Sequence, residues 1–253
     1  MIPGRRLLDE FRYDLLSRIP RCGLSALGRT VYSQNEEDGI IEEIFRRIGT
    51  TNKTFVEIGA GDGLENNTSA LLVKGWKGLW IDRWWNCHKA RRGCKDIIRR
   101  GKLRVVNARV TAENVDEIVR ANCFDTSPDL LSIDIDGNDF WVWDALTIEP
   151  RVLVIEYNSR FSNWSQRYNP KHKWDGSCYQ GSSLEFIANN LCGSYSLVGC
   201  NITGVNAFFV LDDYTGKFAG PGDVETHWRP LRAGLCGIDT GHPRSYKPIN
   251  EVM

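Results

Sequence analysis

A short apolar run that delivers an acidic residue and three alternating glycines carries the strongest chemical signature in this sequence. Thr54 to Ile58 predicts a buried strand, and Gly59, Gly61 and Gly63 follow it as G-x-G-x-G. Glycines let the backbone turn tightly and approach a ligand without a Cβ in the way. Ligands of open α/β sheets bind beyond the carboxyl ends of the strands. The pattern therefore predicts a nucleoside-binding loop where a strand turns into a helix.

The charges of this loop select the kind of cofactor. A dinucleotide fingerprint runs G-x-G-x-x-G, so that its third glycine packs helix on strand and the pyrophosphate meets the helix N-terminus. Here Asp62 lies inside the turn and Glu65 follows it, so two negative charges stand where a pyrophosphate needs donors. The cofactor should therefore lack phosphate and carry positive charge. S-adenosylmethionine, a sulfonium with an amino-acid tail, meets both conditions.

Further acidic residues stand at predicted strand ends. Asp82 lies 25 residues beyond Glu57, close to the roughly 20-residue interval at which nucleotide folds place a carboxylate on ribose hydroxyls. The alternative is an ordinary strand-ending aspartate that caps the next turn, but after this glycine loop ribose binding is favoured. Glu57 either accepts from the ammonium group of the cofactor or braces the loop amides, and the sequence does not separate these roles.

A second group of oxygen ligands is expected at neighbouring strand ends. Asp134 and Asp136 share strand phase at the end of the predicted strand 130–135, because side chains alternate with period two. Glu156 and Asn158 come from the end of the next strand, so the four side chains could converge at one mouth. Such a set suits Mg²⁺ or Mn²⁺. Alternatively, Asp136 contacts cofactor or substrate directly, and Glu156 or Asn158 binds sugar hydroxyls with no metal.

Composition narrows the class of protein. The 253 residues, 42% hydrophobic and 25% charged, predict one globular domain with some additions. Equal numbers of basic and acidic residues, 32 of each, argue against a nucleic-acid partner, although a basic patch over 89–92 and 95–104 remains possible. Eight cysteines without C-x-x-C or zinc spacing indicate reduced thiols. The chain has no apolar signal core and no run near the ~20 apolar residues that span a bilayer, so we expect a cytoplasmic location.

The order of apolar and polar segments predicts a doubly wound α/β sheet. A lead-in helix is expected within residues 1–30, the main domain over 31–212, and a tail packed on its surface over 213–253. Ser33 and Glu36 form a capping-box pattern ahead of an amphipathic helix that Gly49 ends. The predicted strands are Thr54 to Ile58, 78–82, 103–107, 130–135 and 152–157, followed by an antiparallel pair at 195–198 and 206–211.

In this order the motifs resemble the class I S-adenosylmethionine-dependent methyltransferases, and within them the FkbM-like branch. The resemblance covers most of the chain, through residues 32–39, the glycine loop with Asn66-Asn67-Thr68, and residues 75–82, 131–139, 155–158 and 204–210. It implies a Rossmann-like, mostly parallel sheet that closes with a C-terminal antiparallel hairpin. The residues expected at the cofactor are Glu57, Gly59, Ala60, Gly61, Gly63, Asn67, Thr68, Asp82, Arg83, Arg109 and Asp134.

Methyl transfer to an alcohol needs good positioning and a base or metal to take the proton. Asp136, Glu156 and His172 are the candidate bases, in that order. The long segment from 159 to 183 mixes aromatic with amide and charged side chains, and long loops are usually functional. Asn158, Trp164 and Trp174 are expected to bind the acceptor, with sugar hydroxyls on polar partners and sugar C–H faces on aromatic rings.

The hypothesis is therefore an enzyme that methylates a hydroxyl of a sugar or glycan intermediate. A nicotinamide-dependent sugar oxidoreductase would use the same fold, but the glycine spacing and the absence of a Tyr-x-x-x-Lys dyad disfavour it. A catalytically silent, methyltransferase-like binding subunit is the other alternative, because fold and loop alone do not prove turnover. The sequence leaves the acceptor and the oligomeric state open.

Overall fold

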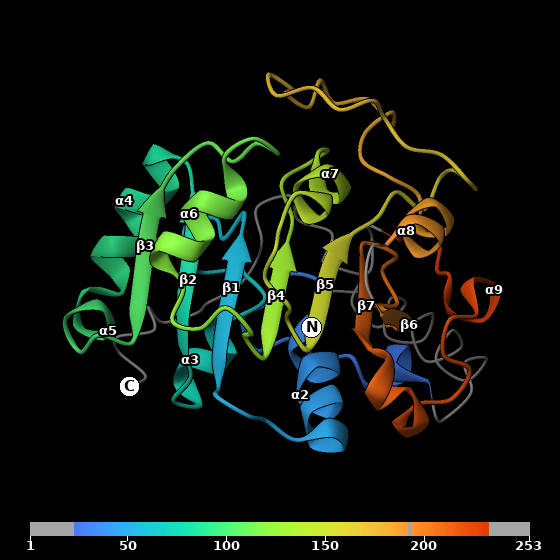
Figure 1. Ribbon diagram of the computed structural model, residues 1–253, viewed down its shortest axis with the longest axis horizontal. Coiled ribbons are helices and arrows are strands. Elements are labelled where there is room, and N and C mark those ends of the chain that lie inside the picture. The colour runs from blue at the N-terminus through green and yellow to red at the C-terminus, as the bar shows by residue number, and fades with distance from the viewer. Residues whose placement is uncertain (1–22, 192–193, 233–253) are drawn as a thin grey trace, which may run out of the picture.

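The computed structural model describes residues 23–191 and 194–232, and its centre is a seven-stranded mixed sheet with strand order β3-β2-β1-β4-β5-β7-β6 (Figure 1). The first five strands run parallel, β7 is antiparallel to β5, and β6 is antiparallel to β7. The predicted Rossmann-like sheet with its C-terminal antiparallel hairpin is confirmed. The strands are β1 (Thr54–Ile58), β2 (Lys77–Asp82), β3 (Leu103–Asn107), β4 (Leu130–Ile133), β5 (Val152–Glu156), β6 (Tyr195–Cys200) and β7 (Asn206–Leu211).

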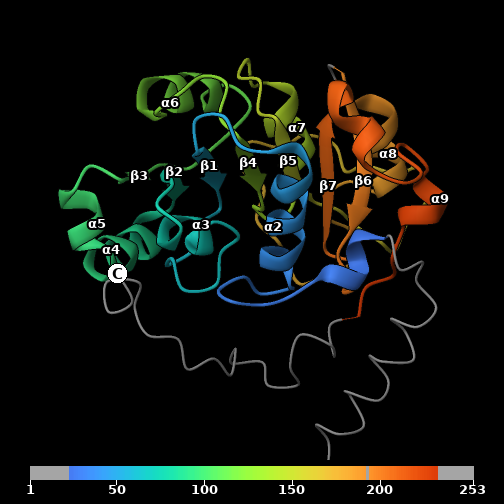
Figure 2. The same ribbon diagram turned by 90° about the horizontal axis from the view of Figure 1, so that it is seen from below.

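Helices cover both faces of the sheet (Figure 2). One face carries α2 (Glu37–Ile48), α3 (Ser69–Val73), α4 (Trp84–Gly93) and α5 (Lys95–Arg99), and the other carries α6 (Val115–Asn122), α7 (Asp139–Asp144) and α8 (Leu184–Asn190). The short elements are η1 (Leu24–Leu27), η2 (Asp212–Lys217) and α9 (Val224–His227). Strand residues alternate between two apolar clusters, because successive side chains point to opposite faces. On β1, for example, Phe55 faces α2, whereas Val56 and Ile58 face α6 to α8.

The capping box predicted at the start of α2 is wrong in naming Glu36 as the partner of Ser33. Ser33 does exchange two hydrogen bonds with a residue of the helix, but that residue is Asp38. The Ser33 hydroxyl accepts from the Asp38 N–H at 3.1 Å, and the Asp38 carboxylate accepts from the Ser33 N–H at 2.8 Å. Glu36 lies just outside the helix in the left-handed region at φ 74°, which shifts the cap by two residues. Gly49 ends the helix as predicted, with φ 70° and its N–H on the Phe45 carbonyl.

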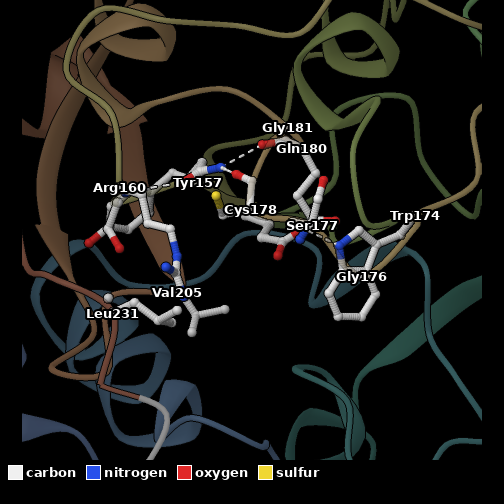
Figure 3. A pocket seen from close by; sticks show the side chains of 14 residues that line it. Tyr157, Arg160, Trp174, Gly176, Ser177, Cys178, Gln180, Gly181, Val205 and Leu231 are labelled. Atoms are coloured by element: carbon white, nitrogen blue, oxygen red, sulfur yellow. Dashed lines mark hydrogen bonds between the residues drawn. The ribbon is translucent and has the colours of Figure 1, made fainter.

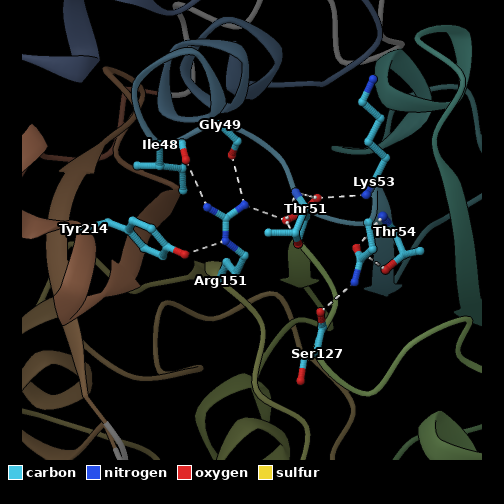
Figure 4. Close-up of polar contacts among 10 residues, drawn as sticks. Ile48, Gly49, Thr51, Lys53, Thr54, Ser127, Arg151 and Tyr214 are labelled. Atoms are coloured by element: carbon cyan, nitrogen blue, oxygen red, sulfur yellow. Dashed lines mark hydrogen bonds and ion pairs between the residues drawn. The ribbon is translucent and has the colours of Figure 1, made fainter.

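A buried ion pair joins the segments at the amino ends of the strands (Figure 4). The Arg151 guanidinium binds Asp129 at 2.7 Å and also donates to the Tyr214 hydroxyl and to the carbonyl oxygens of Ile48 and Gly49. This network ties the end of α2 to β4, β5 and η2. It lies at the sheet edge opposite to the one at which the glycine loop begins.

Two predictions fall partly outside the described residues. For the lead-in helix predicted within residues 1–30, residues 1–22 lie outside the described ranges. Of the rest, Leu24–Leu27 forms a single 3-10 turn. The predicted surface tail is described as far as residue 232, where the Arg232 N–H donates to the Thr203 carbonyl at 2.7 Å. Within the described ranges, no helix is long and apolar enough to cross a membrane.

Candidate active site

The glycine loop after β1 is pressed against the end of β4. Gly59 has φ 89°, and a Cβ built on it would lie 1.7 Å from the Asp134 carbonyl oxygen. Gly63 has φ 83°, and its Cβ would come within 2.7 Å of the Trp80 ring. Both positions therefore need glycine for conformation and for space. Gly61 also has positive φ, at 58°, but open space surrounds it.

Glu57 braces this loop from beneath. Its buried carboxylate accepts hydrogen bonds from the Asn66 side chain at 2.8 Å, from the Asn67 N–H at 2.8 Å and from the Thr68 hydroxyl. Burial raises the pKa of Glu57 to about 7, although the bonds from Thr68 and Asn67 oppose the shift. Of the two roles left open by the sequence, the described contacts are those of loop bracing. Asn67 and Thr68 share that role, because both are buried and bind neighbouring strands. The Asn67 amide donates to the Ser132 hydroxyl, and the Thr68 hydroxyl accepts from the Trp80 ring N–H.

Asp82, at the end of β2, is the carboxylate that faces the loop from the side. One of its oxygens accepts from the Gly61 N–H at 2.7 Å, and the other accepts from the Arg83 N–H and from the Asn86 amide. The side chain is half-buried and lines a cleft. It thus performs the turn-capping role and still offers its oxygens to a ligand.

A cleft of about 790 Å³ opens along the carboxyl ends of β1, β2 and β4. Its size falls within the roughly 300–1,000 Å³ of small-molecule sites. Glu57, Gly63, Asn67 and Thr68 do not line it. The predicted residues that do are Gly59, Ala60, Gly61, Asp82, Arg83, Arg109, Asp134, Asp136, His172 and Trp174.

Three carboxylates meet where this cleft passes from β4 to β5. Asp134, Asp136 and Glu156 each place an oxygen within 4.8 Å of the other two. The sequence argument for this convergence was wrong in one step, because β4 ends at Ile133 and Asp136 has φ 57°, outside any strand phase. The cause is Asp139, whose carboxylate accepts from the N–H groups of Ile135 and Gly137 at 2.7 and 2.8 Å and turns the chain early.

Crowding of negative charge favours protonated carboxyls in this group. Burial raises the pKa of Asp134 well above its usual range, and the charges of Asp139 and Asp136 raise it further. Glu156 is shifted in the same direction, by burial first and then by Asp134. Like charges at this separation oppose one another's ionisation. The group is therefore suited to exchange a proton with a ligand.

These acids belong to a polar layer on the α2 face of the sheet. It consists of the buried Glu37, Glu57 and Asn206 and of the half-buried Asp134 and Glu156. Within it, Glu37 accepts from the amides of Asn201 and Asn206, both at 2.8 Å. Asn206 is paired with Glu156 across β5 and β7. Its Oδ1 atom is buried and has no hydrogen-bond partner among the described residues.

The long loop after β5 brings His172 over the end of β4. The Nε2 atom of His172 lies 2.9 Å from the Asp136 carbonyl oxygen. The Arg109 guanidinium donates to the backbone carbonyl of His172, also at 2.9 Å. A Cβ on Gly137 would come within 2.4 Å of that ring nitrogen, so the glycine admits the imidazole. His172 thus contacts the backbone of Asp136, while its ring lines the cleft.

A second, smaller pocket of about 170 Å³ begins where Glu156 ends β5. Trp174 lies at one end of it, and Arg160, Val205 and Leu231 lie at the other (Figure 3). Trp174 is 53% exposed and lines both the cleft and this pocket. The two hollows are therefore neighbours, with carboxylates where they meet.

Asn158 and Trp164, which were also predicted to bind the methyl acceptor, make contacts that stabilise the loop itself. Asn158 lines the second pocket, but its amide donates to the carbonyls of Cys178 and Gln180 at 2.8 and 2.7 Å and so closes the loop. It is not part of the three-carboxylate group. Trp164 lines neither hollow and packs against the rings of Phe161 and Tyr179 instead.

Sequence reasoning assigned no role to three residues that line the site. Asn86 and Gln34 line the cleft, and Arg160 lines the second pocket. The four-residue spacing of Asp82 and Asn86 on the following helix is a signal that could have found Asn86, since residues i and i+4 are neighbours on a helix. Nothing local marks Arg160, because its pocket is completed by Gly204 and Val205, in the turn before β7, and by Leu231, after α9.

The sequence matches no protein-family model and no curated protein. Solved structures are similar in fold. A magnesium protoporphyrin IX methyltransferase from Synechocystis PCC 6803 with bound S-adenosylhomocysteine (SAH) is 10% identical, with a TM-score of 0.46 over 82% of this chain and 98% of that one. An O-methyltransferase from Bacillus cereus in complex with SAH is 15% identical, with a TM-score of 0.42 over 83% and 91%. An S-adenosylmethionine-dependent methyltransferase from Clostridium acetobutylicum is 13% identical, with a TM-score of 0.43 over 72% and 92%.

Proposed function

We propose that this protein is an S-adenosylmethionine-dependent methyltransferase that methylates a hydroxyl of a sugar or glycan intermediate. One observation carries the proposal: a cleft with an acidic, glycine-rich edge leads directly to three clustered carboxylates, one of which also lines a second pocket. Cofactor and acceptor thus have separate places that meet at groups able to take a proton. The sheet order and the terminal hairpin agree with the resemblance found in the sequence.

The cofactor fits the cleft by charge and by hydrogen bonding. Asp82 would accept from the ribose hydroxyls in place of the contacts that it makes with Asn86 and Arg83. Asp134 faces the cleft with a carboxyl group for the ammonium of the amino-acid tail, and Arg109 is an exposed cation near the tail carboxylate. Because the loop is acidic, a sulfonium is favoured and a pyrophosphate is repelled.

The reaction is an in-line displacement. The acceptor oxygen forms a bond to the methyl carbon while the carbon–sulfur bond breaks, and the sulfonium becomes a neutral thioether. The hydroxyl proton must leave, and Glu156 is the best-placed base because it belongs to the carboxylate group and also lines the second pocket. Its raised pKa makes it a stronger base than an ordinary glutamate. Asp136 is the second candidate, and His172, which contacts the backbone of Asp136, is the third.

The second pocket supports a carbohydrate acceptor. Trp174 offers an exposed ring for the C–H face of a sugar, and polar groups of Ser177 and Gln180 lie beside it. Arg160, at the opposite end, has no side-chain partner among the described residues. A sugar that carries an acidic group, such as a uronate or a sugar phosphate, fits this arrangement better than a neutral one.

A divalent cation at the carboxylates is a second way to take the proton. Asp134, Asp136 and Glu156 would hold Mg²⁺ or Mn²⁺, and the unpartnered Oδ1 of Asn206 would add a neutral oxygen in place of the predicted Asn158. When bound, the ion would lower the pKa of the acceptor hydroxyl. Turnover that EDTA abolishes and Mn²⁺ restores, with SAH binding intact, would support the ion. Full turnover in EDTA would leave Glu156 as a direct base.

Calorimetry with SAH tests the cofactor. We expect micromolar binding, with NAD far weaker. Asp82→Asn should weaken SAH by about 10- to 150-fold, since hydrogen bonds to charged groups contribute about 1.5–3 kcal/mol. Asp213→Asn, an exposed aspartate on η2, is the matched control and should bind like the wild type. Tighter NAD than SAH would favour the oxidoreductase alternative, and unchanged SAH affinity in Asp82→Asn would refute the ribose assignment.

Transfer of labelled methyl from S-adenosylmethionine to a panel of sugars tests the activity. Uronates and sugar phosphates should be methylated faster than the matched neutral sugars, and Arg160→Gln should reduce that preference. Glu156→Gln should abolish transfer while SAH still binds. SAH binding without transfer to any sugar, peptide or phenol would favour the silent binding subunit.

A further inference from the structure

The surface formed by residues 83–104, which includes α4 and α5, differs in charge from the rest of the chain. It holds nine Lys and Arg residues and a single acidic residue, Asp96, although the whole chain has 32 of each sign. These residues lie together at the β3 end of the sheet (Figures 1 and 2). The balanced total therefore hides a strongly basic end of the molecule, which we call the basic end.

Most of the positive charge of this surface is available to a partner. The exposed side chains of Arg92, Lys95 and Arg100 have no hydrogen-bond or ion-pair partner among the described residues. Lys89 has only a long, exposed contact with Asp62, at 3.5 Å. Arg99 is paired with Asp96 at 3.0 Å on the same helix.

Two tryptophans begin α4 on the same surface and project into solvent. Trp84 is 60% exposed and Trp85 is 71% exposed, whereas Cys87 and Ala90 form the buried side of the helix. The two rings contact each other edge to face, with centroids 4.5 Å apart and an interplanar angle of 75°. Neither ring lines the cleft or the second pocket. Neighbouring exposed aromatic rings of this size mark an interaction site.

We propose that the basic end binds the surface of an anionic lipid bilayer, with Trp84 and Trp85 at headgroup depth and the cations on lipid phosphates. Tryptophan favours the membrane–water interface because its ring is amphipathic, and basic side chains beside apolar ones are the signature of interfacial helices. Single-stranded nucleic acid is the competing partner. The edge-to-face pair disfavours it, because each ring covers part of the other and the two faces are not open in parallel for stacking successive bases.

The position of the two tryptophans relates the bilayer to the cleft. Arg83 and Asn86, which flank them, both line the cleft. A bilayer that receives Trp84 and Trp85 would therefore border the cleft rim on the β2 side.

Co-sedimentation of the full-length protein with vesicles tests the proposal. We expect binding to phosphatidylcholine vesicles that contain phosphatidylglycerol, little binding to phosphatidylcholine alone, and a loss of binding as salt is raised. The triple variant Arg92→Gln, Lys95→Gln, Arg100→Gln should lower the partition coefficient by about 100-fold, at roughly five-fold per cation. The variant Trp84→Ala, Trp85→Ala should lower it at least about ten-fold, on the scale of burying large apolar side chains.

Two comparisons keep the result specific. Trp228→Ala removes another exposed tryptophan, 40% exposed and outside the basic end, and should bind vesicles like the wild type. The melting temperatures of all variants should match the wild type, because the exchanged side chains are exposed. Equal binding to neutral and anionic vesicles, or wild-type binding by the triple variant, would overturn the proposal. So would single-stranded RNA that binds more tightly than the vesicles and displaces them.

Discussion

Glu57→Gln should remove a large part of the pH dependence of stability. Glu57 is buried beneath the glycine loop, and burial raises its pKa in the folded protein to about 7, from 4.5 for an unperturbed glutamate. The raised pKa means that the folded state holds the proton more tightly than the unfolded state. Stability from this group is therefore fully present below about pH 4.5 and is lost as the pH rises toward 7. Glutamine has no titratable proton, so the stability of the variant should not fall with pH on account of this residue.

The magnitude follows from the shift. At 1.36 kcal/mol per pKa unit, the full loss is on the order of 3 kcal/mol, and most of it falls between pH 5 and pH 8. Urea unfolding of both proteins across this range gives the difference in free energy of unfolding, wild type minus variant, which should fall by that amount. The constant cost of turning an amide toward three donors cancels in this comparison.

Other buried carboxyls shift in the same direction, so the wild-type curve alone does not isolate Glu57. Glu117→Gln, an exposed glutamate on α6, is the matched control and should follow the wild-type curve. Equal pH dependence in the wild type and in Glu57→Gln would refute the reasoning. It would mean that the three hydrogen bonds outweigh burial and keep this carboxylate ionised throughout.

Three further outcomes test other parts of the structure. Gly61→Ala should lower the free energy of unfolding by about 1–2 kcal/mol because of its positive φ. Gly59→Ala should lower it by at least about 1–3 kcal/mol more, because its Cβ clashes with the end of β4. Urea unfolding measures both losses, and equal losses would contradict the close contact at Gly59. Trp174→Ala should lower kcat/KM for the acceptor by about 5- to 150-fold, on the scale of burying a large aromatic side chain, and should leave the melting temperature unchanged. Trp164→Ala should instead lower the melting temperature. The reverse result would exchange the roles of the two tryptophans. Arg151→Met should destabilise the protein by about 3–5 kcal/mol, because it leaves a buried carboxylate without its cation, yet calorimetry should show unchanged SAH affinity in the protein that remains folded.

The strand positions and the acids at strand ends were predictable because both depend on local pattern. Short apolar runs locate strands such as β1, and the polar residue that ends such a run marks the carboxyl edge, as with Asp82. The convergence of Asp134 and Glu156 followed from parallel strands ending at one edge. These features need no knowledge of tertiary contacts beyond the strand order.

The remaining features depend on turns and contacts that the periodicity of the sequence does not encode. Asp136 leaves the strand phase because Asp139 captures the preceding N–H groups, and no periodicity encodes that turn. The contacts of Glu57 come from Asn66 to Thr68, ten residues away in a loop whose path the sequence does not specify. The second pocket is assembled from the loop after β5 and the chain after α9, so it becomes visible only in three dimensions.

Both faces of the sheet are apolar along most of their length, but toward α2 the carboxyl ends of the strands also carry the polar layer of the site. This asymmetry gives the two faces a different tolerance of sequence change. On the face toward α6 to α8, residues such as Ile133 and Leu153 can be exchanged for others of similar volume with little effect on the charges of the site. On the α2 face, an exchange at Glu37 would remove a charge that acts on Asp134 and the acceptor of the Asn201 and Asn206 amides. Attempts to stabilise this protein, or to evolve it toward other acceptors, should therefore place stabilising substitutions under α6 to α8 and leave α2 intact.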